Sequence, residues 1–185
     1  MNIRKVVAVL GCLADELGPI DKLKACKLLY YIDKLHLIEY GRFVTGDIYF
    51  KLPLGPIPSQ VLDIINERGN LFKEEEAYLR RYLIIGSDKN RTIKCKNKPD
   101  LKELSESETI IIQRVINEYG RYTSSRLVDI SHKENSWQNA SEHGEISAYD
   151  MIDELPAERK KALVEILKED SDNNKALTHL FSKNA

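Results

Sequence analysis

The stretch that most constrains the fold is residues 22–39, which has the pattern of a helix without a polar face along its middle. Asp21 is a favourable N-cap for this helix, and Gly41 suits its carboxyl end. Residues 28–32 are apolar around the whole circumference, and a helix of that kind is normally buried at the centre of a domain. The rest of the chain must surround this helix, so we predict a single core built around it.

The composition is typical of one soluble globular domain. The 185 residues are 42% hydrophobic and 31% charged, which is too apolar for a disordered chain. The 28 basic and 29 acidic residues give a formal net charge of −1, so the chain has no overall attraction to nucleic acid or to an acidic membrane surface. No apolar run approaches the ~20 residues of a membrane span, and we expect no membrane partner.

The cysteine pattern indicates a reducing compartment. Cys12, Cys26 and Cys95 are odd in number and widely spaced, without a C-x-x-C pair. A small secreted domain would have an even disulfide framework, and a structural zinc site would have closely spaced ligand pairs. We therefore expect free thiols, a cytoplasmic location, no metal and no cofactor.

Apolar periodicity outlines the elements of the first half. Residues 3–17 follow the spacing of one helical face, and residues 48–52 alternate as a strand with one buried face. The proline-rich residues 54–58 predict a stiff turn, and a helix is expected from Ser59 to shortly before Gly69. Residues 77–96 are interpreted as a β-hairpin, although residues 74–81 can also begin as a helix.

Helix signals dominate the second half. Ser105 and Glu108 form a capping box for a helix that ends at Gly120, and Thr123 or Ser124 caps a further helix through residue 130. Residues 97–104 form a polar connector, and short helices are expected at 149–155, from Pro156 onward and at 176–181. The predicted fold is α+β and helix-dominated, a compact helical domain with a small antiparallel sheet or hairpin. Residues 1–150 form the domain, and residues 151–185 a helical extension packed on it.

Asp33 and His36 are the first candidates for chemistry, because they lie three residues apart on one face of the central helix. In a catalytic interpretation, Asp33 orients the imidazole of His36 for acid–base work or metal ligation. In a structural interpretation, the two form a buried polar pair that satisfies itself and stabilises the packing. We favour the structural interpretation, because catalysis needs several converging groups.

A second cluster runs from Ser131 to Trp137. His132 falls at a predicted helix end, where the carbonyl dipoles favour imidazolium. An H-E-x-x-H metal site requires ligands on one helix face. His132 and Glu134 are two residues apart and therefore do not share a face. We interpret Trp137 as a core anchor rather than as an interface hot spot.

An enzyme would need four distant side chains to converge in one pocket, namely Asp33, His36, His132 and Glu134. The chain has no glycine-rich phosphate loop, no G-x-S-x-G elbow and no catalytic cysteine context. We therefore predict a protein that is not an enzyme, and we keep metal-assisted or acid–base catalysis by these four residues as the alternative.

The one basic concentration falls on the predicted hairpin and comprises Lys89, Arg91, Lys94, Lys96 and Lys98. Such a run could contact phosphates as part of a nucleic-acid-binding regulator. Alternating lysines more often keep a strand edge soluble, and the rest of the chain supplies no basic face. Nucleic acid is thus a second alternative and not the expected partner.

Several motifs occur together in one order: K-L-L-Y-x-x-D-x-x-H, Y-G, T-G-D-x-Y and G-P-x-P, then S-H-x-E followed by tryptophan. Over about residues 20–140 this pattern resembles the Panacea domain, the family of SocA-like and phage-associated GepA-like antitoxins. The matched residues that we take as candidate site residues are Lys27, Tyr30, Asp33, His36, Thr45, Gly46, Asp47, Tyr49, Gly55, Pro56, Ser131, His132, Glu134 and Trp137.

The resemblance implies the antitoxin half of a toxin–antitoxin pair, which binds its cognate toxin directly and blocks it. In the SocA-like case it also implies delivery of the toxin to a protease. The family has no established catalytic residues, and its toxin partners are diverse. Residues 151–185 lie outside the resemblance and are candidates for specifying the partner.

We interpret the matched residues as determinants of the fold. On a buried helix, Asp33 and His36 can hydrogen-bond the turn at residues 45–47 or the turn at 55–56, and so clamp the small sheet against the helix. Contacts with a toxin would then lie on other surfaces.

Overall fold

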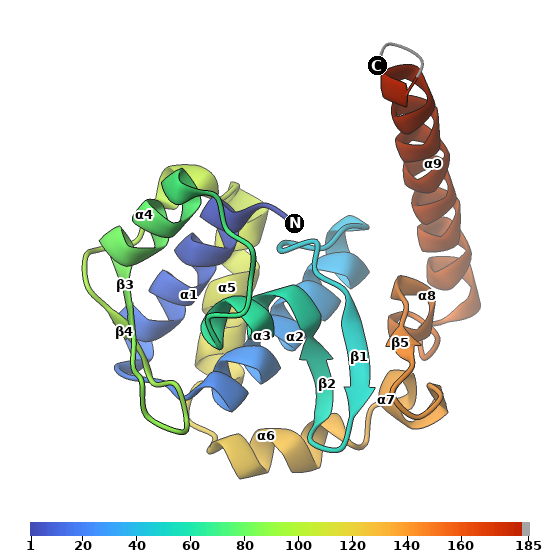
Figure 1. Ribbon diagram of the computed structural model, residues 1–185. Helices are drawn as coiled ribbons and strands as arrows, with labels where there is room; N and C mark the ends of the chain where they lie inside the picture. The colour runs from blue at the N-terminus through green and yellow to red at the C-terminus, as the bar shows by residue number, and fades with distance from the viewer. Residues whose placement is uncertain (183–185) are drawn as a thin grey trace.

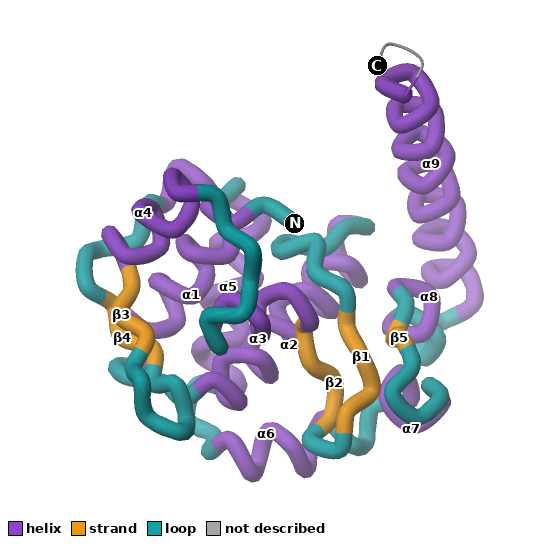
Figure 2. Tube along the Cα trace, in the orientation of Figure 1, coloured by secondary structure: helices purple, strands orange, loops and turns teal. Residues whose placement is uncertain are grey.

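The computed structural model describes residues 1–182, with side chains for residues 1–169, 171 and 172. Helix α2 (Lys22–Tyr40) lies at the centre, between α1 (Ile3–Leu17) and α5 (Glu106–Tyr119) on one side and a β-hairpin on the other (Figure 1). Figure 2 shows that helices predominate and that the strands form two small groups. The predicted helix-dominated α+β fold is confirmed.

The all-round apolar sequence of α2 explains its central position. Nearly every residue between Ala25 and Leu37 is buried, because α2 packs against α5, against α3 (Ser59–Ile65) and against α6 (Ser124–Ser131). Asp21 accepts a hydrogen bond from the Lys24 N–H at the start of α2, and Gly41 ends the helix in the left-handed conformation, as predicted.

The larger sheet has the strand order β2-β1-β5, from β1 (Tyr49–Leu52), β2 (Gly55–Pro58) and β5 (Glu145–Ile146). The prediction that residues 54–58 form only a turn is wrong, because residues 55–58 pair with β1. The Ser59 N–H donates to the Ile48 carbonyl, so residue 59 is a hydrogen-bonded position opposite β1. Hydrogen-bonded and non-hydrogen-bonded positions alternate along an antiparallel pair, and Pro56 and Pro58 therefore fall at non-hydrogen-bonded positions. Prolines are tolerated there because β2 is an edge strand and no ladder donor is lost.

The second sheet pairs β3 (Leu83–Ile85) with β4 (Ile93–Cys95). The predicted hairpin is correct for these residues and wrong for residues 77–82, which belong to α4 (Lys73–Tyr82). The helix is favoured because three glutamates occupy its first turn and two arginines its last, complementing the helix dipole.

Local capping signals explain where α5 and α6 begin. The capping box of Ser105 and Glu108 begins α5, and Thr123 caps α6, as predicted. A 3₁₀ turn (Leu101–Glu103), helix α7 (Asn135–Asn139) and strand β5 were not predicted. Cys26 is buried and the other two cysteines are partly buried, all three as free thiols.

The carboxyl-terminal part consists of α8 (Ala148–Met151) and α9 (Ala157–Ser182). The expectation of separate helices from Pro156 and at 176–181 is wrong, because one continuous helix covers both. Its first turns contact α2: Arg159 donates to the carbonyls of Ile38 and Glu39, and Leu163 is buried. Further on, α9 extends away from the rest of the molecule (Figure 1). In the described part of the chain, every helix is too short or too polar to cross a membrane.

Candidate functional site: a buried polar frame around helix α2

Helix α2 carries four buried polar side chains, Lys27, Asp33, Lys34 and His36. Burying charged or polar groups is costly unless each finds a partner, so the contacts of these four side chains show what they do. Each of them reaches a different part of the chain. Together with those partners they make a set of contacts that we call the polar frame.

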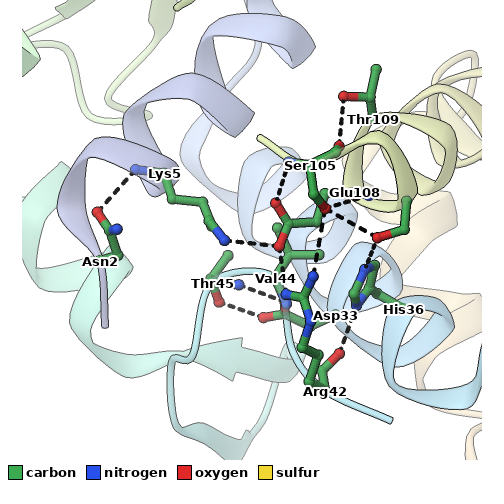
Figure 3. A network of polar contacts seen from close by, with 11 residues as sticks. Asn2, Lys5, Asp33, His36, Arg42, Val44, Thr45, Ser105, Glu108 and Thr109 are labelled. Atoms are coloured by element: carbon green, nitrogen blue, oxygen red, sulfur yellow. Dashed lines mark hydrogen bonds and ion pairs between the residues drawn. The ribbon is translucent and has the colours of Figure 1, made fainter. Parts of the chain in front are cut away.

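Asp33 is the centre of the polar frame. Its carboxylate accepts hydrogen bonds from the N–H groups of Val44 (2.7 Å) and Thr45 (2.9 Å) and from the Thr45 hydroxyl (Figure 3). It also accepts a hydrogen bond from the Tyr49 hydroxyl (2.8 Å). Burial raises the pKa of Asp33, and the four donors act in the opposite direction. The prediction that Asp33 clamps the turn at residues 45–47 is confirmed.

Asp47 extends the frame to α3. Its carboxylate accepts from the backbone N–H groups of Gln60 (3.0 Å) and Val61 (2.8 Å), in the first turn of α3. The N-cap residue of α3 is Pro58, whose side chain makes no capping bond, so Asp47 caps the helix from a distant loop. Gly46, with φ of 67°, allows the turn that brings Asp47 into place.

Lys27 holds β2. Its ammonium Nζ donates to the carbonyl of Pro56 (2.8 Å), which points away from β1 at the sheet edge. Burial lowers the pKa of Lys27 to about 7. Gly55 has φ of 92°, and a Cβ there would lie 2.6 Å from Lys27 Nζ and overlap the Ser131 hydroxyl. Glycine is therefore required for this close approach of β2 to α2 and α6.

His36 does not bind Asp33, so the expected Asp33–His36 pair is wrong. The spacing of three residues places both side chains on the same face of α2. The Asp33 carboxylate, however, binds Val44 and Thr45, whereas the His36 ring binds Arg42. His36 Nδ1 lies 2.7 Å from the carbonyl oxygen of Arg42, and Nε2 lies 3.1 Å from the Ser107 hydroxyl in α5 (Figure 3). Burial lowers the pKa of His36. His36 thus joins the end of α2 to the start of α5.

Glu108 completes this end of the frame, in a role that the sequence analysis missed. Its carboxylate is fully buried and binds Lys5 Nζ (2.8 Å), the Arg42 guanidinium (2.6 Å) and the Ser105 N–H (2.9 Å). Burial alone would raise its pKa, but these three donors lower the pKa of Glu108 to about 2. The capping box revealed the Ser105 contact, whereas nothing local indicated Lys5 or Arg42.

The segment at residues 131–137 is attached to α2 at two points. Lys34 forms an ion pair with Glu134, and the Tyr30 hydroxyl lies 2.7 Å from the Ser136 hydroxyl. These contacts bring α7 against the middle of α2.

Trp137 ties the same segment to β1. Its indole N–H donates to the Leu52 carbonyl (3.2 Å), its ring stacks on His132 with centroids 4.1 Å apart, and Lys51 Nζ lies 4.8 Å from the ring centroid. Lys51 also donates to the Ala140 carbonyl (3.0 Å). Trp137 is therefore packed at the junction of α7 and the sheet, and the Nε2 of His132 is buried without a hydrogen-bond partner.

Comparison with known protein families matches residues 26–138 to the family described as antitoxin SocA-like, Panacea domain. The chain belongs to this family. All the candidate residues of the polar frame on α2, the sheet and residues 131–137 fall inside the matched range of the Panacea domain. Searches of curated proteins and of solved structures found no match.

The Panacea domain does not bring the four residues of the enzyme alternative together. Asp33 binds the turn at residues 44–49, His36 binds Ser107, His132 stacks on Trp137 and Glu134 pairs with Lys34. Within the residues that the structure describes, no group of three or more His, Cys, Asp and Glu side chains is arranged to hold a metal ion. The convergence that this alternative needs is not found.

The basic residues of the β3–β4 hairpin separate into two kinds. Arg91 is engaged with Glu67 (2.9 Å) and with the carbonyls of Gly86 and Asn66. Lys96 donates to the Arg80 carbonyl (3.2 Å), while Lys89 and Lys94 are exposed. The hairpin therefore presents some free positive charge, although less than its sequence indicates.

Proposed function

We propose that this protein is the antitoxin of a toxin–antitoxin pair and that it neutralises a cognate toxin by binding it directly, without catalysis, in the cytoplasm. The observation that carries the proposal is the match to the antitoxin SocA-like family over residues 26–138. The same range contains the polar frame except for Lys5, which pairs with Glu108 from helix α1.

The contacts of the frame support a binding role for the rest of the surface. Asp33, Lys27 and His36 are buried, and their polar atoms bind other parts of the same chain. Side chains with such partners stabilise the fold and are not available to a ligand. We propose that all the matched residues of the frame act as fold determinants, and that exposed side chains bind the toxin.

Co-expression with the product of the adjacent gene tests this function. We expect that product alone to arrest growth, and the pair to grow and to co-purify as a complex at equimolar ratio. If growth is restored without a complex, or not restored at all, the proposal is wrong. A shorter half-life of the adjacent gene product in the presence of this protein would add delivery to a protease to the mechanism.

The role of the frame can be separated from binding with His36→Gln, which retains one hydrogen-bonding position of the ring. We expect loss of neutralisation only in proportion to loss of folded protein, because His36 has no surface to offer a partner. A variant as stable as the wild type that fails to neutralise would show that His36 contributes to toxin binding itself.

We also propose that residues 151–185 form a helical extension on the Panacea domain and do not make a second domain. The contacts of Arg159 and Leu163 with the body of the protein support this arrangement.

A further inference from the structure

Strand β3 has one paired edge and one open edge. The Lys96 N–H donates to the Tyr82 carbonyl and the Gly86 N–H to the Thr92 carbonyl, both at 2.8 Å. Hydrogen-bonded positions alternate along an antiparallel strand. The backbone N–H and C=O of Ile84 therefore point toward β4, whereas the backbone groups of Leu83 and Ile85 point outward.

One of these outward groups is already satisfied. The Leu83 N–H bonds the Leu79 carbonyl at the end of α4. The Leu83 carbonyl and both backbone groups of Ile85 have no backbone partner among the described residues. An unpaired row of this kind is a template for adding a strand from another chain.

A groove of about 420 Å³ lies beside this open edge. Its walls are β3, α4 and the segment from Ile64 to Leu71, and its lining is mostly apolar, with Ile64, Leu71, Leu79, Leu83, Ile84 and Ile85. Ile84 is 49% exposed, and Phe72, the N-cap residue just before α4 and outside the lining of the groove, is 75% exposed. The groove therefore offers apolar contacts next to unpaired backbone groups, which is the combination that binds an extended peptide.

The walls of the groove are held in place by the protein itself. Arg91 spans from the hairpin to the end of α3, where it binds Glu67 and the Asn66 carbonyl. On the other side of the hairpin, the N–H and carbonyl of Ile93 exchange hydrogen bonds with Ile20 at 2.7 and 3.1 Å. A preformed site loses less conformational entropy when it binds a ligand.

The charges around the groove indicate the character of the ligand. The two acidic side chains of the lining are already paired, Glu67 with Arg91 and Glu76 with Arg80. Lys96 in the lining and the exposed Lys94 and Lys89 have no carboxylate partner among the described residues. Within the lining of the groove, Lys96 is the charged side chain without a partner of opposite charge among the described residues, so an acidic ligand is complementary to it.

We propose that β3 and this groove bind an extended segment of a partner protein, with apolar side chains at alternate positions and acidic residues beside them, by strand addition. The identification of that partner as the toxin rests on the proposed function, whereas the chemistry of the site does not. A second copy of this chain is a poorer ligand, because it would bring the same lysines against one another.

Selection from a phage-displayed library of random peptides about ten residues long, on the full-length protein, tests the site. We expect the selected peptides to alternate apolar residues with others and to be rich in Asp and Glu. Binding of a selected peptide should slow amide hydrogen exchange at Ile85. If no peptide is selected, or if exchange is slowed elsewhere and not in β3, the inference is wrong.

Two variants separate strand addition from other modes. Ile85→Pro removes an N–H that points outward, so pairing with β4 is retained. Ile84→Glu replaces an exposed side chain and adds a repelling charge. We expect each to weaken peptide binding about tenfold or more, while the matched control Ile110→Glu, 52% exposed on α5, changes it less than about twofold. Thermal unfolding of each variant verifies that it is folded, and a folded Ile85→Pro that binds normally would contradict the proposal.

Further outcomes identify a different ligand. If a single-stranded DNA oligonucleotide displaces the peptide with equal affinity, the surface is a nucleic-acid site and the proposal is wrong. If the wild type is dimeric by light scattering and Ile84→Glu is monomeric, the ligand is a second copy, and the proposal again fails.

The growth assay distinguishes this inference from the proposed function. If the wild type neutralises the adjacent gene product and folded Ile84→Glu and Ile85→Pro do so equally, β3 is not the toxin-binding site although the function stands. If the wild type fails to neutralise it but binds peptides at β3, the function is wrong and the site stands.

Discussion

At the scale of single residues, the polar groups of the frame are buried with partners far away in the sequence. Lys27, Asp33 and Glu108 each have almost no solvent contact, and each binds a backbone group or a charged side chain of another element. Such groups contribute to stability only while they keep the right protonation state. Their effect is therefore visible in the pH dependence of unfolding.

Lys27 should make the protein more stable in mild alkali. The pKa of Lys27 is about 7 in the folded protein, compared with the ordinary lysine value of 10.5 expected in the unfolded chain. Between these two pH values the unfolded chain binds more protons than the folded protein, so the free energy of unfolding rises with pH. We expect urea unfolding to show this rise from about pH 7 to pH 9.5 in the wild type, and a smaller rise in Lys27→Met. The exposed Lys102→Met is the matched control and should behave as the wild type. An unchanged rise in Lys27→Met would contradict the assignment.

Glu108 should contribute to stability in the opposite pH range. The pKa of Glu108 is about 2 in the folded protein, compared with the ordinary glutamate value of 4.5. The contribution of Glu108 to stability is therefore complete above about pH 4.5 and is lost as the pH falls toward 2. Glu108→Gln should lose about 1–3 kcal/mol near pH 6 and little near pH 2. Urea unfolding at the two pH values measures this, with the exposed Glu106→Gln as control. Equal losses at both pH values would mean that packing, and not charge, is responsible.

At the scale of elements, the frame supplies from a distance what local sequence does not. Helix α3 begins after two prolines of an edge strand and has no capping side chain of its own. Asp47 caps it because Asp33 and Thr45 hold the preceding turn in position. Asp33 on α2 is thus connected, through the turn at residues 44–47, both to the first residue of β1 and to the start of α3.

Asp47→Ala should destabilise the protein by about 1–3 kcal/mol, because it leaves the N–H groups of Gln60 and Val61 without acceptors. Asp63→Ala removes an exposed carboxylate of α3 itself and should cost less than about 0.5 kcal/mol. The free energies of unfolding in urea measure both. Equal effects of the two substitutions would show that Asp47 does not act as the cap.

At the scale of the whole molecule, the question is whether α9 belongs to the same folding unit. The first turns of α9 contact the end of α2, where Ile166 lies next to Gly41 and Leu163 is buried. If residues 151–185 are an extension of the Panacea domain, as we propose, damage at this contact should lower the stability of the entire protein.

Leu163→Ala should lower the free energy of unfolding by about 2–4 kcal/mol, because it creates a cavity between α9 and the body. Ile166→Ala, at a side chain that is 41% exposed, should have a smaller effect. Fluorescence of Trp137 reports on the junction of α7 and the sheet, and far-ultraviolet circular dichroism reports on the helices. We expect the two signals to change together in one transition, and separate transitions would indicate an independent carboxyl-terminal unit.

Features of this fold that depend on neighbouring residues could be predicted from the sequence, and features that depend on distant residues could not. The interior position of α2, the capping by Asp21 and the capping box at Ser105 follow from residues within a few positions of one another, and they were predicted correctly. The ion pairs of Glu108 with Lys5 and Arg42 join residues 103 and 66 positions apart, and no local pattern signals them. Asp33 and His36 share a helix face, but the turns that approach that face decide their partners.

Apolar periodicity and capping thus determined by themselves that this chain is helix-dominated and that residues 22–40 are its centre. The tertiary structure decided which buried polar groups pair, that residues 55–58 become a strand, and that β3 keeps an open edge beside a groove. The physical reason is the distance along the sequence between the residues that interact. Helices form through contacts between neighbours three and four residues apart, whereas strand pairing and the pairing of buried charges depend on segments that meet only when the chain has folded.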